Sequence, residues 1–501
     1  MSQIPPQPNP TCPSGVQGLD EILSGGLPAG SMYLIRGDPG VGKTTLALQF
    51  LFTGRDLGES VLYITLSETR KELNAVAFSH GWTLDGVHVI DLGDVEGRLL
   101  AEEQSTVFHP AEVELNEITA FLKAQVIRLN PSRVAFDSLS ELRLMTQSAL
   151  RFRRQMLALK QFFAARQCTV MFLDDNTATE AEEQVESIAH GVINLEKLVA
   201  GYGKTRRQLN VEKLRGVNFH EGNHDYVIRH GGIVVFPTLR TAVSARGYSR
   251  DLVPSGLKEM DDLVQGGLQR GTSNLFIGPA GAGKSVLATQ YAVTSAQRNE
   301  RVAIFNFDEN LGVSYARSES LNPDFSAQVE KKMIHLTKVD IGSLPPGELA
   351  HRIKHAVEVD EVRMVIVDSI NGYLNAMPDE KYLILQLREI LTYLHEHDVT
   401  SIIMVAQHGM MGSMNSPVDV TFLADTVVLF RFFEVGGSIR KALSVAKKRV
   451  FGHESTIREY MIDGKGIRIG APLSEFHGVL TGVPSFVGAT GQMLEPNQRA
   501  R

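Results

Sequence analysis

A long internal repeat constrains this chain more than any other feature of its sequence. Residues 14–27 read SGVQGLDEILSGGL, and residues 255–268 read SGLKEMDDLVQGGL. The separation between these segments also relates Lys43 to Lys284, so the register extends well beyond the segments themselves. Solenoids repeat every ~20–50 residues, and the period here is much longer. The repeat therefore indicates two related domains in tandem.

The length of the chain fits this organisation. At roughly 150 residues per domain, 501 residues suggest two or three domains. We expect the boundary near residue 246, because the stretch 237–254 is rich in Ser, Arg and Gly and has little periodicity, as is typical of a linker. The predicted organisation is a flexible tail (1–13), a first domain (14–246), a second domain (247–484) and a C-terminal tail (485–501).

The composition excludes several classes of protein. Apolar residues make up 43 % and charged residues 21 %, which resembles globular averages and not disordered, collagenous or coiled-coil chains. The 57 acidic residues outnumber the 50 basic ones, so the net charge of −7 gives no overall attraction for nucleic acid or anionic lipid. Cys12 and Cys168 are too few for a disulfide framework, and no apolar run approaches the ~18 residues of a membrane span. We therefore expect a cytoplasmic protein.

Short apolar runs alternate with longer helical patterns in each copy of the repeat. This alternation predicts parallel βαβ units with right-handed crossovers. Each half is therefore expected to be a doubly wound α/β domain, with a mostly parallel sheet flanked by helices. In the first copy we expect strands at 32–36, 61–66, 133–136 and 169–173, and helices at 44–52 and 149–165.

Each copy contains a phosphate-binding loop. Residues 37–44 (GDPGVGKT) and 278–285 (GPAGAGKS) match the pattern G-x-x-x-x-G-K-[ST], between a predicted strand and a predicted helix. Glycines let consecutive backbone N–H groups point at phosphates, and the helix adds its dipole. A purely structural glycine turn is the alternative. The expected nucleotide contacts are Gly37, Asp38, Pro39, Gly40, Val41, Gly42, Lys43, Thr44 and Thr45 in the first domain, and Gly278, Pro279, Ala280, Gly281, Ala282, Gly283, Lys284, Ser285 and Val286 in the second.

A nucleotide bound with Mg²⁺ needs cations for its phosphates and oxygen ligands for its metal. Lys43 and Lys284 are expected to reach the β- and γ-phosphates. The hydroxyl after each lysine is one metal ligand, and an apolar run that ends in Asp supplies another at 133–137 and 364–368. An Asp that merely caps a strand-to-helix turn is the alternative. The predicted metal ligands are Thr44, Asp137, Ser285 and Asp368.

Hydrolysis or phosphoryl transfer also requires a carboxylate that orients or deprotonates the attacking oxygen. The strand after the first helix of each copy ends in acidic residues, and the candidates are Glu68, Asp308 and Glu309. Simple solvation at the surface is the alternative, because acids are common at strand ends. The motifs predict nucleotide hydrolysis without distinguishing ATP from GTP.

With these residues in place, the chain resembles the KaiC-type circadian clock ATPases of the RecA-like class, which carry two such domains in tandem. The resemblance covers roughly residues 14–484 and includes both phosphate loops and both Asp-Ser strand ends. It also includes a basic element late in each copy, at 213–216 and at 447–449, and we call these the late basic elements. It implies ATP and Mg²⁺ as cofactors, and a homohexamer with ATP at the subunit interfaces. In this family the late elements contact nucleotide across the interface, which carries over to Lys213, Leu214, Arg215, Lys447, Arg449 and His453. A solvated basic strand is the alternative.

Some positions depart from the family pattern. The family has two adjacent Glu residues at the catalytic strand end, whereas Ser67 takes one of these places in the first domain and Asp308 in the second. Turnover in the first domain is expected to change. KaiC autophosphorylates an adjacent Ser-Thr pair, and alignment puts Thr421 and Phe422 there, with Ser416 matching a further hydroxyl upstream. Ser416 and Thr421 are therefore the candidate phosphoacceptors, and Ser/Thr autokinase activity is expected in the second domain.

The resemblance also bears on partners. It implies a KaiB-like or signalling partner, while the tail after Gly482 is shorter than the segment with which the clock proteins engage KaiA, which argues against dependence on a KaiA-like protein. The sequence fits a clock-like switch and a signalling role equally well.

Two other functions compete with an ATPase-autokinase. A DNA-stimulated RecA-like ATPase needs basic or aromatic loops, but Lys and Arg are absent from 174–190 and from 408–430. The first of these stretches carries Asp174, Asp175, Glu180, Glu182, Glu183 and Glu186. Such loops repel a phosphate backbone. The other alternative is an ATP-gated assembly module without kinase activity, which the altered Ser67 and Asp308 keep open.

Overall fold

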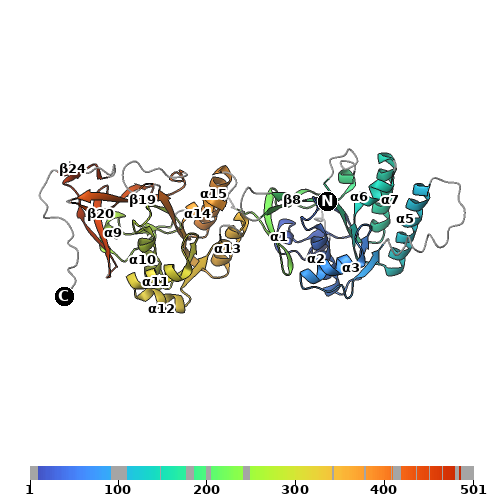
Figure 1. Cartoon of the computed structure of the whole chain (residues 1–501), viewed down its shortest axis with the longest axis horizontal. Helices are drawn as coiled ribbons and strands as arrows, with labels where there is room; N and C mark the ends of the chain where they lie inside the picture. Colours follow the sequence, from blue (N-terminus) through green and yellow to red (C-terminus); the bar gives the residue numbers. More distant parts are fainter. Residues whose placement is uncertain are drawn as a thin grey trace, which may run out of the picture. The chain divides into compact units, whose positions relative to one another are not determined.

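The chain divides into two compact units, Met1–Thr238 and Leu239–Arg501 (Figure 1). The boundary expected at residue 246 lies in a segment outside the described residues and stays a prediction. The computed structural model describes residues 10–91, 110–146, 148–176, 185–198, 205–240, 249–340, 344–376, 380–407, 409, 419–435, 437–450, 452–464, 466–479 and 485–486.

The first unit is built around a nine-stranded sheet in the order β11-β10-β9-β8-β3-β7-β6-β4-β5. The strands from β8 to β5 are parallel, and β9, β10 and β11 extend the sheet as antiparallel neighbours. Its strands are β3 (Met32–Gly37), β4 (Val61–Thr65), β5 (His88–Asp91), β6 (Arg133–Asp137), β7 (Thr169–Asp174), β8 (Gly191–Leu198), β9 (Arg206–Leu214), β10 (Asn223–Arg229) and β11 (Gly232–Phe236). A separate pair is formed by β1 (Thr11–Cys12) and β2 (Leu27–Pro28). The helices are α1 (Leu19–Ile22), α2 (Lys43–Asp56), α3 (Arg70–Ser79), α5 (Pro110–Leu129), α6 (Leu139–Met145) and α7 (Ala149–Ala164).

The second unit repeats this topology, with the sheet order β16-β15-β17-β18-β14-β19-β20-β21-β22. Its strands are β14 (Ser273–Pro279), β15 (Arg301–Asn306), β16 (Ile334–Lys338), β17 (Val362–Asp368), β18 (Thr400–Gln407), β19 (Thr426–Val435), β20 (Ser438–Lys448), β21 (Ile457–Asp463) and β22 (Gly466–Pro472). Two further pairs are β12 (Leu252–Val253) with β13 (Leu268–Gln269), and β23 (Phe476–His477) with β24 (Ser485–Phe486). The helices are α9 (Lys258–Leu263), α10 (Lys284–Gln297), α11 (Leu311–Leu321), α12 (Asp324–Glu330), α13 (Pro346–Glu358), α14 (Ile370–Ala376) and α15 (Glu380–Glu396).

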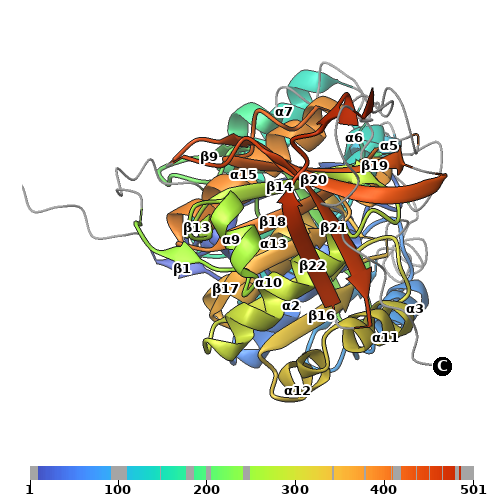
Figure 2. The ribbon, with the colours of Figure 1, turned by 90° about the vertical axis from the view of Figure 1, so that its left-hand side faces the viewer.

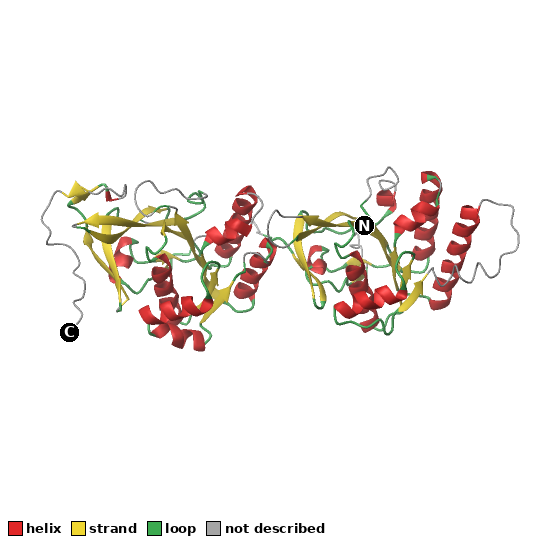
Figure 3. Cartoon of the chain, viewed as in Figure 1, coloured by secondary structure: helices red, strands yellow, loops and turns green. Residues whose placement is uncertain are grey.

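The predicted fold class is confirmed, because both sheets are mostly parallel and are flanked by helices (Figure 3). The expected strands are present. Three of them run one residue further, so that Asp137 is itself the last residue of β6, whereas β4 ends one residue earlier than expected, at Thr65. The expected linker stretch contains β12, which pairs within the second unit, and the expected tail contains β24. In the described part of the chain, none of the helices is both long and apolar enough to span a bilayer.

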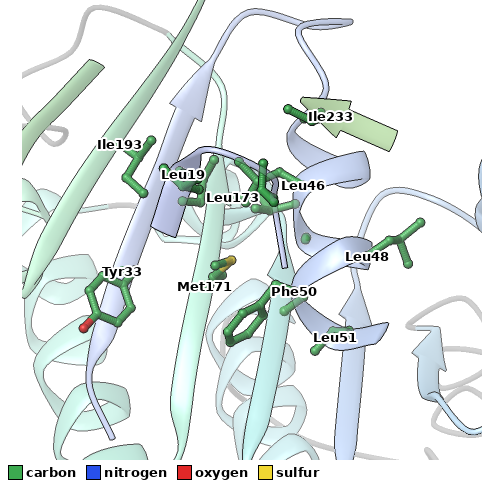
Figure 4. Packing of buried hydrophobic residues seen from close by; sticks show 14 of the residues in the cluster. Leu19, Tyr33, Leu46, Leu48, Phe50, Leu51, Met171, Leu173, Ile193 and Ile233 are labelled. Atoms are coloured by element: carbon green, nitrogen blue, oxygen red, sulfur yellow. The ribbon is translucent and has the colours of Figure 1, made fainter. Parts of the chain in front are cut away.

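Each sheet buries both of its faces, and alternate residues of one strand serve opposite faces. In the first unit Tyr33 and Met171 join a buried cluster with Phe50 of α2 (Figure 4). Tyr63 of β4 belongs to the same cluster. Leu34, which follows Tyr33 on β3, faces the other side of the sheet and joins a cluster with residues of α5, α6 and α7. The second unit shows the same separation into two clusters, with α10 on one face and α15 on the other (Figure 2).

Candidate functional sites

The phosphate loops lie at the carboxyl ends of the central strands β3 and β14. Helix α2 begins at Lys43 and α10 begins at Lys284, each directly after a glycine. Gly42 has φ 108° and Gly283 has φ 95°, a left-handed conformation that favours glycine. The motif therefore folds as expected in both units, with the backbone N–H groups of a helix start at the loop.

A buried tyrosine supports each loop from the antiparallel part of the sheet. The Tyr226 hydroxyl donates to the backbone oxygen of Val41 at 2.7 Å, and Tyr460 donates to the backbone oxygen of Ala282. Neither tyrosine was anticipated from the sequence. The sequence does contain one indication: Tyr226 and Tyr460 are separated by the same number of residues as Lys213 and Lys447, so they occupy equivalent positions in the two copies.

The two loop lysines have different surroundings. Lys43 Nζ donates to the Gly37 oxygen at 2.6 Å and forms an ion pair with Asp175 Oδ1 at 2.7 Å. Lys284 Nζ donates to the Gly278 and Pro279 oxygens at 2.7 and 2.8 Å. Burial lowers the pKa of Lys284 to about 8, a shift that Asp368 opposes.

A hydroxyl and a carboxylate approach one another beside each loop. In the first unit Thr44 Oγ1 lies 3.4 Å from Asp137 Oδ2, which also accepts a 2.6 Å hydrogen bond from Tyr63. Burial raises the pKa of Asp137, while Tyr63 and Lys43 act in the opposite direction. Asp368 of the second unit has the same character: burial raises its pKa, and a hydrogen bond with Ser285 opposes the rise.

These hydroxyl-carboxylate pairs fit Mg²⁺, a hard cation that takes one or two protein oxygens and completes its shell with phosphates and water. No group of three His, Cys, Asp or Glu residues able to hold a metal alone occurs within the described ranges. A metal here would therefore depend on the nucleotide for its remaining ligands. It would stabilise negative charge on the phosphates, and Thr44, Asp137, Ser285 and Asp368 are the residues that would hold it.

The candidate catalytic carboxylates also differ between the units. Glu68 has a buried Oε2 atom without a hydrogen-bond partner in the described structure, and burial followed by the charge of Asp137 raises its pKa. In the second unit Asp308 accepts a 2.6 Å hydrogen bond from Ser369, and Glu309 forms an ion pair with Arg317. The three acids thus lie just after the ends of β4 and β15, and among them only Glu68 has a buried carboxylate oxygen that lacks a partner in the described structure.

The backbone at these acids is held in the same way in both units. Glu68 N–H donates to Thr65 Oγ1 at 2.9 Å, and Glu309 N–H donates to Asn306 Oδ1 at 2.9 Å. In the first unit the chain then enters α3 through a capping box: Thr69 accepts from the Glu72 N–H, and the Glu72 carboxylate accepts from the Thr69 N–H.

Removal of this cap is expected to be measurable. Thr69→Ala should lower the free energy of unfolding of the first unit by about 1 kcal/mol, because it leaves the Glu72 N–H without its acceptor at the start of α3. Trp82, the single tryptophan of the chain, lies just after α3 and reports unfolding of this unit by fluorescence. Ser79→Ala is the matched control, because Ser79 is an exposed hydroxyl bound to the Val76 oxygen at the other end of α3. Equal losses from both variants would contradict the prediction.

In each unit the late basic residues donate hydrogen bonds to backbone oxygens of one segment of the same unit. Lys213 Nζ donates to the Glu186 backbone oxygen at 2.6 Å, and Arg215 donates to the Ser187 backbone oxygen at 2.9 Å. In the second unit Lys447 donates to the Thr421 oxygen at 3.0 Å. Arg449 donates in the same way to the Phe422 oxygen, Leu214 is buried at the end of β9, and His453 is half-buried in the segment between β20 and β21.

These contacts locate the candidate phosphoacceptor. Lys213 and Lys447 occupy equivalent positions, and their side chains donate to the backbone oxygens of Glu186 and Thr421 respectively. Glu186 is therefore the first-unit counterpart of Thr421. Thr421 is half-buried and its hydroxyl donates to Asp419 Oδ1 at 2.6 Å. Ser416, the other candidate, lies outside the described residues.

Comparison with known proteins decides the family. The family model described as "ATPase: KaiC" matches residues 12–240 and 253–474, one match for each unit. The chain belongs to the KaiC ATPase family.

Several KaiC proteins are similar over nearly the whole chain. The "Circadian clock oscillator protein KaiC" of Thermostichus vulcanus is 25 % identical over 486 residues, which cover 95 % of this chain and 92 % of the relative. The protein of the same name from Synechococcus elongatus is 24 % identical over 482 residues, covering 94 % and 91 %. The "Circadian clock protein KaiC3" of Synechocystis sp. is 25 % identical over 496 residues, covering 94 % of each chain.

Proposed function

We propose that this KaiC-family protein hydrolyses ATP at both phosphate loops, phosphorylates itself on Ser/Thr in its second domain, and acts as a clock-like or signalling switch. The observation that carries the ATPase proposal is the pair of hydroxyl and carboxylate oxygens beside each loop lysine. Thr44 Oγ1 lies 3.4 Å from Asp137 Oδ2, and Ser285 is close enough to Asp368 to oppose the rise in the pKa of that carboxylate. These oxygens suit the metal of an Mg-ATP complex, and the loop lysines suit its phosphates.

In this proposal the active assembly is a cytoplasmic homohexamer with ATP at the subunit interfaces. Lys213, Arg215, Lys447 and Arg449 would then contact the nucleotide of a neighbouring subunit, as the resemblance implies. The proposed domains are 14–246 and 247–484, the further partner is KaiB-like or a signalling protein, and neither nucleic acid nor a membrane takes part.

The autokinase proposal rests on Thr421. Its hydroxyl donates to the Asp419 carboxylate, and its backbone oxygen is bound by Lys447, so an acceptor hydroxyl is held beside a carboxylate and a cation. A carboxylate that accepts a hydroxyl proton is what phosphoryl transfer to Ser or Thr requires.

The second candidate function is an ATP-gated assembly module without kinase activity. It is favoured by the engagement of both second-domain acids, Asp308 by Ser369 and Glu309 by Arg317. If those contacts persist with ATP bound, the nucleotide would hold the assembly together without being consumed.

The test is incubation of the purified chain with Mg-ATP, followed by assay of ADP release, assembly state and phosphosites. We expect ADP release that falls in Lys43→Ala and in Lys284→Ala and is lost in the double variant. Phosphate on Thr421 or Ser416 that disappears in Lys284→Ala would support the autokinase. ATP-dependent assembly without ADP release would support the second candidate instead, and no ATP binding at all would contradict both.

A further inference from the structure

The two phosphate loops differ in whether the loop lysine forms an ion pair with a carboxylate of the same unit. In the first unit Asp175 pairs with the loop lysine Lys43 at 2.7 Å. The sheet register identifies the second-unit counterpart of Asp175. Strand β3 pairs Ile35 with Leu173, and β14 pairs Phe276 with Met404 in the same way. Counting forward along β7 and β18 from these partners makes Ala406 the residue in the place of Asp175.

Within the described residues, the second loop lysine consequently lacks a carboxylate partner. Among the described residues, Lys284 Nζ donates to the backbone oxygens of Gly278 and Pro279. Only 7 % of the residue is exposed, and burial lowers its pKa to about 8, a shift that the charge of Asp368 opposes without forming an ion pair in the described structure. A polyphosphate would supply the missing counter-charge.

The catalytic acids show the reverse difference. Glu309 of the second unit pairs with Arg317, which projects from α11. The separation that relates Glu68 to Glu309 also relates Val76 to Arg317, and Val76 packs as an apolar side chain against the core of the first unit. Glu68 therefore has no arginine at this position, and its Oε2 atom is buried without a partner in the described structure.

These differences act on separate steps of the same reaction. A lysine already paired with a carboxylate must exchange that partner for a phosphate when the nucleotide binds. The displaced carboxylate then lies near the phosphates as a like charge, so the nucleotide binds more weakly and is released faster. A carboxylate paired with an arginine must leave that pair before it can orient a water molecule or accept its proton, so hydrolysis slows.

We propose that Asp175 and Arg317 give the two sites different rates, a division of work in which the first site exchanges and hydrolyses ATP quickly. The second site retains ATP and hydrolyses it slowly. Asp175 and Arg317 act as positioning residues, because each works through the loop lysine or the acid that it holds. The inference rests on the proposed ATPase function and deepens it. Neither residue belongs to the phosphate-loop motif.

The test exchanges the residues between the sites of the full-length chain. Asp175→Ala is measured in a Lys284→Ala background, which reports on the first site alone, and Arg317→Val in a Lys43→Ala background, which reports on the second. We expect Asp175→Ala to slow release of a fluorescent ATP analogue about tenfold, the effect of one close charge pair. We expect Arg317→Val to raise the kcat of hydrolysis about three- to tenfold with little change in KM.

The reciprocal variants are the matched controls. Ala406→Asp should speed nucleotide release from the second site, and Val76→Arg should lower kcat at the first. Arg317→Gln removes the charge while keeping a polar, though shorter, side chain, so it should also raise kcat and guards against a folding defect in Arg317→Val. Thermal unfolding with and without Mg-ATP verifies that each variant is folded.

The outcomes separate this proposal from the one it rests on. Normal ATP binding with unchanged release in Asp175→Ala, or with unchanged or reduced kcat in both Arg317 variants, would overturn the division of work and leave the ATPase proposal standing. A wild-type chain that neither binds nor hydrolyses ATP would overturn both.

Discussion

Replacement of Arg133 by alanine is expected to lower the free energy of unfolding of the first unit by about 3 kcal/mol, the lower end of the usual loss when one member of a buried ion pair is removed, because the Glu59 side chain is 30 % exposed. Arg133 is the first residue of β6 and is fully buried. Its guanidinium binds the two Glu59 carboxylate oxygens at 2.6 and 3.1 Å, and also the backbone oxygens of Pro13 and Phe50 at 2.7 and 3.0 Å. The variant leaves a carboxylate and two carbonyl groups without this donor.

The measurement follows Trp82 fluorescence in a denaturant titration, which isolates the first unit because the second contains no tryptophan. Arg133→Met tests the same site with less loss of volume, since the register places Met364 at the equivalent position of the second sheet. It should cost less than alanine and more than about 1 kcal/mol, because it restores packing but no hydrogen bond.

The comparison for a surface ion pair is Arg301→Ala. Arg301 pairs with Glu361 at 3.3 Å, but the two side chains are 43 % and 78 % exposed, and such pairs contribute about 0–1 kcal/mol. Its effect on the second unit is read from the far-UV signal. A loss below 1 kcal/mol in Arg133→Ala would show that the buried network contributes no more than a surface pair.

The fold could be predicted from the sequence because its signals are local. Buried parallel strands appear as short apolar runs, and the phosphate loops fix the strand before them and the helix after them. The sequence predicts that strand β6 ends at Phe136, one residue before Asp137, because a carboxylate at the end of an apolar run does not reveal whether the backbone is still paired. The constant separation of the two copies then predicts the same topology twice.

The contacts that distinguish the two sites could not be predicted in this way. Asp175 and Lys43 are distant in sequence and meet only because β7 lies beside β3 in the sheet. Neither periodicity nor a motif marks such a pair. Tyr226 was missed for the same reason, since its partner is a backbone oxygen of a loop at the other end of the unit's sequence.

The acidic stretch 174–190 shows how charge counting overstates repulsion. Asp175 pairs with Lys43, Asp174 with Arg143, and Glu186 with Arg36. Three of the six acids are thus neutralised by basic side chains from other parts of the unit. Their field on a nucleic acid is therefore weaker than the sequence suggests, and the argument against a DNA-stimulated ATPase depends more on the shortage of basic residues than on acidic repulsion.

The second large effect is expected at the first glycine of a phosphate loop. A methyl group on Gly278 would lie 2.5 Å from the backbone oxygen of Phe430 and 2.7 Å from its Cβ atom, and β14 and β19 cannot separate without loss of their pairing. Gly278→Ala should therefore destabilise the second unit by about 2–3 kcal/mol. It should also weaken ATP binding there at least about tenfold, because the Gly278 oxygen that holds Lys284 moves with the strand.

Gly281→Ala separates this crowding from a general sensitivity of the loop. A methyl group at Gly281 meets nothing within 4 Å, and its φ of 76° adds only the strain of a left-handed residue, about 1–2 kcal/mol. Both variants are compared in a Lys43→Ala background by far-UV thermal unfolding and by retention of ATP through gel filtration. Gly278→Ala should lose ATP while Gly281→Ala keeps a substantial part of it. If the two retained ATP equally, the close approach of β14 to β19 would have no role in shaping the phosphate loop, and the glycine would serve only to turn the chain.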